Sequence, residues 1–208
     1  MLLARKRLCN FGLCLMAGFL LFAVVNRPEA ALAQFSPTFD FLKALNKNDY
    51  AGGKSKLMQG ANVNAKNDDG IPALIMATDM GEPAMVKFLL EQGAHVDEPV
   101  QATGETALMH AASAGDKLTA GVLLYYKANV DEQDKHGETA LIKAARSGHS
   151  DMVKLLLEVG ADIDLQDYTG QSALDHVQNT RQRAIERMLV DAQAKRDAAA
   201  KGNAAAKH

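Results

Sequence analysis

Gly137-Glu-Thr-Ala-Leu-Ile-Lys-Ala-Ala145 is the stretch that decides the fold, because the chain repeats it at a nearly constant spacing. The other copies are Gly70-Ile-Pro-Ala-Leu-Ile-Met-Ala77, Gly104-Glu-Thr-Ala-Leu-Met-His-Ala-Ala112 and the shortened Gly170-Gln-Ser-Ala-Leu174. Their starting glycines are 34, 33 and 33 residues apart. A fixed period of this length is typical of a solenoid of stacked repeats. The sequence therefore predicts an extended binding surface rather than a catalytic pocket in one closed core.

Each repeat predicts two short helices joined by a tight turn, as residues 137–169 illustrate. Thr139 is placed to cap a first helix whose apolar residues run from Leu141 to Ala145. That helix is expected to end at Ser147-Gly-His149, where glycine suits a turn with positive φ. A second helix is predicted from Asp151 to Glu158, followed by a projecting loop or hairpin. Neither helix can bury its apolar face alone, so neighbouring repeats must complete the core.

At these residues the chain resembles the ankyrin repeat proteins. Their pattern Gly-x-Thr-Pro-Leu-His-x-Ala-Ala-x-x-Gly-His, followed by Val-x-x-Leu-Leu-x-x-Gly-Ala, is matched by residues 137–161 with few departures. The resemblance implies an all-α solenoid of helix-turn-helix repeats with short loop or β-hairpin connections. It covers a repeat domain over residues 38–190, with about five repeats: an N-terminal cap 38–69, three repeats 70–103, 104–136 and 137–169, and a C-terminal cap 170–190.

Three departures from the family pattern are expected to affect the stack. The family's histidine is replaced, so the resemblance implies that side-chain hydrogen bonds between neighbouring repeats are missing; the residues there are Ile75, Met109, Ile142 and Asp175. Glycine falls within second helices at positions 52, 53 and 121, where each costs about 1 kcal/mol relative to alanine. The loop that contains Pro99 is one residue longer than its counterparts. That loop is either an accident of spacing or a contact with a partner.

The N-terminus has the three-part layout of a secretory signal peptide. Arg5-Lys-Arg7 precedes an apolar run over residues 11–25, and Ala31-Leu-Ala33 offers small residues for cleavage. This run of about 15 residues is shorter than the roughly 20 that a membrane-spanning helix needs. We therefore expect residues 1–33 to be removed after Ala33, leaving 34–37 as a short leader on a periplasmic protein. The alternatives are secretion, or an uncleaved anchor that tethers the repeats to the inner membrane.

Cysteine and charge usage narrow the classes of partner. Cys9 and Cys14 both lie in the segment expected to be removed, so the mature chain would have no disulfide and no thiolate metal site. Residues 34–180 contain 12 Lys and Arg against 21 Asp and Glu, which disfavours binding to nucleic acid. The remainder is basic, and its Ala/Lys-rich tail, 191–208, is predicted to continue as a helix and to become disordered from Ala198. This tail could contact a membrane or an acidic partner.

No motif in the chain predicts catalysis, a cofactor or a bound metal. Gly53-Lys-Ser55 lacks the earlier glycine of a phosphate-binding loop and is expected on a solvent-facing helix. His149-Ser-Asp151 lies at the turn between helices, where a structural role is expected. The histidines show no ligand spacing, and the Asn62-Val-Asn64 and Asp162-Ile-Asp164 loops are expected to form turns rather than calcium sites. We therefore predict a protein without enzymatic activity, cofactor, metal or small-molecule substrate.

The resemblance implies that the loop tips and the exposed sides of the first helices bind a partner. The residues predicted for this face are Asp68, Asp69, Ile71, Asp79, Met80, Thr103, Glu105, Ser113, Ala114, Lys135, His136, Glu138, Arg146, Ser147, Tyr168, Thr169 and Gln171. Among them Tyr168, His136, Arg146 and Met80 are the expected energetic anchors, in line with the weight of aromatic and arginine side chains in hot spots. The sequence thus predicts a monomeric scaffold that binds another protein of unknown identity. A secreted effector or toxin-neutralising binder is the alternative.

Overall fold

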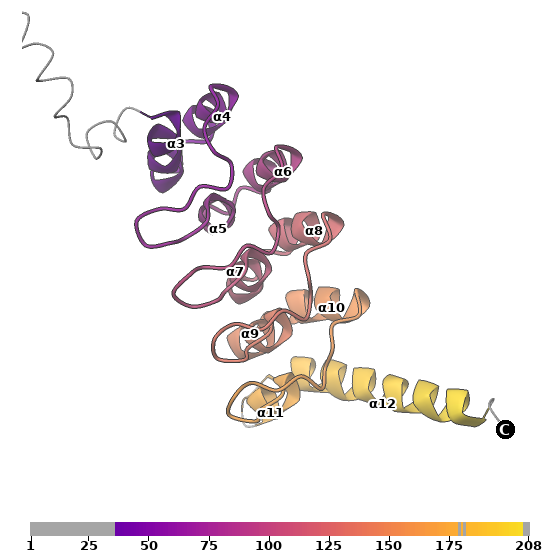
Figure 1. The fold of residues 1–208 in the computed structure, drawn as a ribbon. Helices are drawn as coiled ribbons and strands as arrows, with labels where there is room; N and C mark the ends of the chain where they lie inside the picture. The colour runs from indigo at the N-terminus through magenta and orange to yellow at the C-terminus, as the bar shows by residue number, and fades with distance from the viewer. Residues whose placement is uncertain (1–35, 179, 181, 206–208) are drawn as a thin grey trace, which may run out of the picture.

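The chain is a solenoid of α-helices arranged in two layers (Figure 1). The computed structural model describes residues 36–178, 180 and 182–205. The first helices of the repeats are α3 (Pro37–Asn46), α5 (Ala73–Asp79), α7 (Ala107–Ala114), α9 (Ala140–Ser147) and α11 (Ala173–Gln178). The second helices are α4 (Tyr50–Met58), α6 (Pro83–Glu91), α8 (Lys117–Tyr125), α10 (Ser150–Glu158) and α12 (Arg183–Ala205). This arrangement confirms the predicted all-α repeat solenoid.

Two surfaces follow from this arrangement. The connecting loops project to one side of the stack (Figure 1). Together with the exposed sides of the first helices, these loops form what we call the loop-side face. The exposed sides of the second helices form the outer face. Among the described residues no helix is both long and apolar enough to cross a membrane; the expected signal peptide lies outside that part of the chain.

The turn between the two helices of a repeat forms as predicted. Thr139 caps α9 by accepting a hydrogen bond from the backbone N–H of Ile142 at 3.3 Å. Gly148 ends α9 with φ at 82°, in the left-handed region that favours glycine. His149 follows at the start of α10, and its Nε2 lies 2.9 Å from the carbonyl oxygen of Ser113 in the preceding repeat. The structural role predicted for His149 is therefore confirmed.

The hydrophobic core is continuous through the stack because each repeat buries its apolar faces against the next. Leu108, Leu141 and Leu156 are each at most 1% exposed, and they belong to one cluster that extends from Phe41 to Leu189. Fully burying one such side chain stabilises a fold by about 1.5–3 kcal/mol. The stacking predicted from the helix patterns is therefore the source of stability.

Side-chain hydrogen bonds between repeats are present, so the prediction that they are missing is wrong. Asp97 accepts a hydrogen bond from the backbone N–H of Asn129 at 3.0 Å, and Asp131 accepts one from Asp162 at 2.8 Å. Loop carboxylates thus supply the bonds that the family pattern assigns to a helical histidine. Asp162 itself also accepts from the N–H of Asp164 at 3.0 Å, which confirms the predicted turn-forming role of this loop.

Both ends of the repeat domain differ from their predicted boundaries. Helix α3 begins at Pro37 rather than 38, because Ser36 caps it by accepting from the N–H of Phe39 at 3.1 Å. At the other end, α12 crosses the expected boundary at 190 and continues to Ala205, so disorder from Ala198 is wrong as far as that residue. An Ala-rich sequence extends a helix that is already nucleated by packing at little cost.

A strained residue at the end of α8 allows a first prediction. Lys127 has φ at 68°, whereas Gly60, Gly93 and Gly160 occupy the corresponding positions of other repeats. Side chains other than glycine are disfavoured in this region by roughly 1–2 kcal/mol. We expect Lys127→Gly to raise the free energy of unfolding by about 0.5–1 kcal/mol, since the greater freedom of unfolded glycine offsets part of the gain. Urea denaturation measures it; an unchanged or lower stability would contradict this account.

Candidate functional site

A ladder of side chains follows the loop-side face at one position of each repeat. Six residues after the repeat glycines lie Met76, His110, Lys143 and His176. From the second of these onward, each side chain contacts carboxylates from its own or a neighbouring repeat. The charged part of the ladder therefore spans the stack from α7 to α11.

Lys143, at the centre of the ladder, is a buried cation held by three carboxylates. Its Nζ lies 2.8 Å from an oxygen of Glu105, 2.8 Å from Asp134 and 3.0 Å from Glu138. The side chain of Lys143 is 6% exposed and that of Asp134 is fully buried. Burial acts to lower the pKa of Lys143, but the three carboxylates outweigh it and raise the pKa above its usual range. The ammonium group therefore stays charged and links the repeats that contain Glu105 and Glu138.

His110 extends the network toward the preceding repeat. Its Nδ1 lies 2.9 Å from Asp79, and its Nε2 lies 3.7 Å from Glu105. Burial acts to lower the pKa of His110, yet the hydrogen bond and charge of Asp79, together with the charge of Glu105, raise the pKa in sum. The nearby charge of Lys143 opposes this increase. His110 thus contributes a protonation-dependent contact between repeats.

The stability that His110 provides is expected to depend on pH. A raised folded pKa means that this contribution is fully present below the unfolded pKa of about 6.5 and is lost as pH rises through the folded pKa. We expect the difference in urea midpoint between the wild type and His110→Gln to be larger at about pH 5.5 than at about pH 8.5. His136→Gln is the matched control, since His136 is exposed. Equal differences at the two pH values would contradict the pairing of His110.

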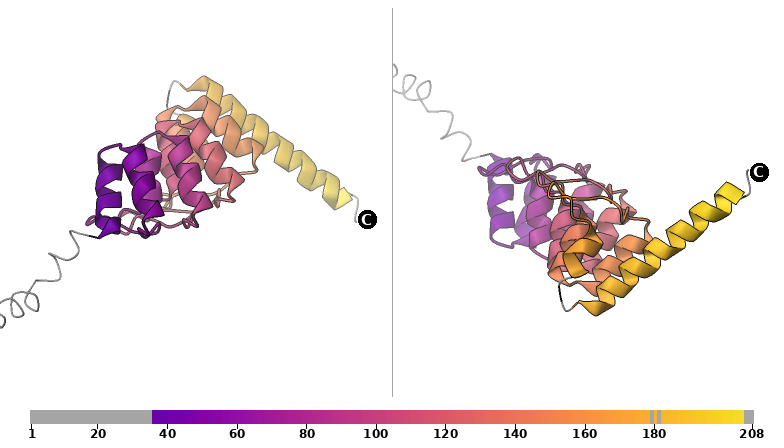
Figure 2. Two further views of the ribbon diagram at one scale, coloured as in Figure 1. Left: turned by 90° about the horizontal axis from the view of Figure 1, so that it is seen from above. Right: turned by 90° about the horizontal axis from the view of Figure 1, so that it is seen from below.

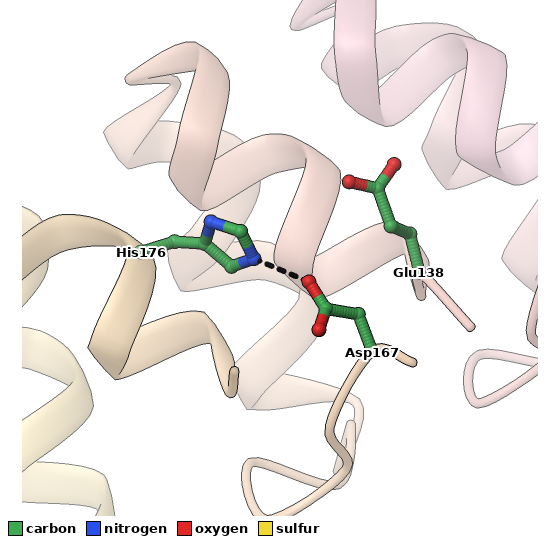
Figure 3. A group of neighbouring side chains, drawn as sticks. All are labelled: Glu138, Asp167 and His176. Atoms are coloured by element: carbon green, nitrogen blue, oxygen red, sulfur yellow. Dashed lines mark hydrogen bonds and ion pairs between the residues drawn. The ribbon is translucent and has the colours of Figure 1, made fainter. Parts of the chain in front are cut away.

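Glu138, Asp167 and His176 lie side by side where the ladder reaches α11 (Figure 3). One ligand atom from each lies within 4.8 Å of the others, which is the residue chemistry of a metal site. However, Lys143 and Arg146 each bond to one oxygen of Glu138, and His176 Nε2 lies 2.8 Å from an oxygen of Asp167. The two neighbouring cations would repel a metal ion, so the geometry favours an ion-pair network.

Asp167 is fixed by several donors at once. Burial acts to raise its pKa, but hydrogen bonds from Thr169, Gln171 and His176 hold the pKa well below its usual range. Asp167 is therefore an anion at neutral pH and shapes the loop that presents the exposed Tyr168.

A hollow of about 500 Å³ opens beside this network. Its lining comes from the three last repeats, and the residues are Thr103, Glu105, His136, Glu138, Lys143, Arg146, Asp167, Thr169, Gln171 and His176. The groups are almost all polar or charged, so the hollow suits a polar contact rather than an apolar ligand.

Most of the residues predicted for the partner-binding face lie at its surface. Ile71, Met80, Thr103 and Glu105 are half-buried, whereas the exposed ones are Asp68, Asp69, Asp79, Ser113, Ala114, Lys135, His136, Arg146, Ser147, Tyr168, Thr169 and Gln171. Glu138 is the correction: it is 7% exposed because Lys143 and Arg146 cover its carboxylate. A partner therefore cannot contact Glu138 as a free loop-tip residue.

The network also contains residues that the sequence prediction missed. His110, Asp134, Lys143, Asp167 and His176 were not among the predicted contacts, although they line or support the same face. Their signal was the repeat register itself, because a charged residue recurs six positions after the glycine where a half-buried helix position lies. The last three repeats thus share one polar site.

Comparison with known families agrees with the fold. A family model described as ankyrin repeats, in three copies, matches residues 41–134 and again residues 117–200. These matches cover most of the chain, which belongs to the ankyrin repeat family. Ankyrin repeats are modules for protein–protein interaction, and the family is typically a non-catalytic scaffold.

Proposed function

We propose that the protein is a non-catalytic scaffold, exported to the periplasm through its N-terminal signal peptide, that binds a partner protein on the loop-side face of its last three repeats. The supporting observation is Tyr168, which is 74% exposed at a loop tip next to the 500 Å³ hollow. Exposed aromatic side chains of this kind are common anchors in interfaces.

The rigidity of the surroundings supports this assignment. The backbone N–H of Tyr168 donates to the carbonyl oxygen of His136 at 2.9 Å, and Lys135 donates in the same way to Thr103 at 2.9 Å. The tips of successive loops are therefore tied to each other before a partner arrives. A surface that is already ordered loses less conformational entropy on binding.

The experiment replaces Tyr168 with the photocrosslinking residue p-benzoylphenylalanine in the cell of origin. We expect irradiation to give one dominant adduct with a protein of the periplasm. The same residue at Lys154, an exposed position on the outer face, is the matched control and should not give that adduct. If both positions give the same adducts, or if neither does although the protein is folded and abundant, the proposed face is wrong.

The exported state is tested separately on the same material. Mass spectrometry of the mature protein should find an N-terminus at Gln34, and fractionation should place it in the periplasm. A protein that retains residues 1–33 in the inner-membrane fraction would support a tethered adaptor instead, without deciding which face binds.

A further inference from the structure

The second helix of the middle repeat departs from its neighbours on the outer face. In α6, Lys87 Nζ lies 3.8 Å from Glu91, and in α10 Lys154 Nζ lies 3.9 Å from Glu158. Both pairs are exposed and four residues apart, as is usual for a solvated helix. In the register of the repeats, α8 has Gly121 and Tyr125 at these two positions.

The first turn of α8 shows the same change. Leu118 occupies the position that Asp151 occupies in α10, and it is 75% exposed. Tyr125, two turns later on the same side of the helix, is 78% exposed. Its ring packs edge-on against Tyr126 at a centroid distance of 5.4 Å, which restricts its orientation.

Gly121 lies between these two side chains and forms a notch. A Cβ atom built on Gly121 would have no other atom within 4 Å, so the space above the helix is open. Glycine destabilises the interior of a helix and no turn or positive φ requires it here. Exposed apolar residues that gather in this way are typical of an interaction site.

The size and charges of this patch define what fits it. Nine residues of α8 extend for about 13.5 Å, too little to bury the roughly 1,200 Å² that a stable pair of domains needs. A peptide-sized segment is therefore a better fit than a second copy of the chain. At the level of Tyr125 the neighbouring helices place Glu91 and Glu158 in register on either side, which favours basic groups in the segment.

We propose that the outer face of α8 is a second binding site, which accepts a short helical segment of a partner protein. An aliphatic side chain of this segment enters the notch at Gly121 and packs against Leu118 and Tyr125. Lysine or arginine residues that flank it reach Glu91 and Glu158. This site is independent of the loop-side face.

The test uses a synthetic helical peptide of about 12 residues, with leucines along one face and lysines at its ends. The wild-type protein is compared with Leu118→Asp/Gly121→Lys/Tyr125→Glu, which gives α8 the residues that α10 has at these positions. This variant should fold, since it adds helix-forming residues and a charge pair. We expect it to bind the peptide at least tenfold more weakly by fluorescence anisotropy.

Two controls establish whether the peptide binds at α8 and whether its charge matters. Tyr168→Glu on the loop-side face should leave the affinity for the lysine peptide unchanged, and a peptide with glutamates at its ends should bind the wild type at least tenfold more weakly. Equal binding of the α8 variant, equal binding of the glutamate peptide, or loss of binding in Tyr168→Glu alone would each overturn the proposal. A wild-type dimer in sedimentation equilibrium that the α8 variant abolishes would show that a second copy is the occupant instead.

Discussion

Replacing Lys143 with methionine is expected to lower the free energy of unfolding by about 3–5 kcal/mol. The methionine fills a similar volume but leaves the carboxylates of Glu105, Asp134 and Glu138 without their shared cation. Asp134 is the most costly of these, because its side chain is fully buried. Urea denaturation followed by far-UV circular dichroism measures the loss.

Lys154→Met is the matched control for this substitution. Lys154 is 64% exposed and lies 3.9 Å from Glu158 on the outer face, so its removal should change stability by no more than about 0.5 kcal/mol. Similar losses for the two variants would show that the Lys143 network contributes no more than a surface pair.

The effect of Lys143→Met should also depend on pH. The folded-state pKa values of Glu105 and Asp134 are lowered in the wild type, although burial acts to raise them, because Lys143 stabilises their charged forms. Their contribution is therefore present above the unfolded pKa values of about 4 and is lost as pH falls through the folded values. Without Lys143 these carboxylates bind protons more readily, so the deficit of the variant should be smaller at about pH 4.5 than at about pH 7.

The fold could be predicted from the sequence because each repeat specifies its structure locally. A cap at Thr139, a glycine at 148 and two short apolar faces are enough to define one unit, and the period defines how units stack. The cross-repeat hydrogen bonds could not be predicted from the missing helical histidines, because Asp97 and Asp131 make them from loops.

The binding face was predicted less completely, and Glu138 shows why. Its position in a repeat suggests an exposed loop tip, but its exposure depends on Lys143 and Arg146, which lie later in the chain and fold over it. Lys143 in turn is buried only because Glu105, 38 residues earlier, faces it across the repeat boundary. Such burial is a property of several side chains together, whereas the repeat pattern reports each position alone.

The C-terminal helix provides the second large effect, because α12 is both the cap of the solenoid and the start of the tail. Leu189 is 2% exposed and belongs to the continuous core, whereas the distal half of α12 extends beyond the other second helices (Figure 2). We expect Leu189→Ala to lower the free energy of unfolding by about 2–4 kcal/mol, through lost burial and the cavity that remains.

The adjacent Val190→Ala is the control for this substitution. Val190 lies on the same turn of α12 but is 48% exposed, so we expect a change of about 0.5 kcal/mol or less. Differential scanning calorimetry should show a lower Tm for Leu189→Ala and nearly the wild-type value for Val190→Ala. If both variants lose the same small amount, α12 is a solvated extension rather than the cap. A loss confined to Leu189 means that the repeat domain includes α12 at least to this residue, because a terminal repeat must cover the apolar face of its neighbour.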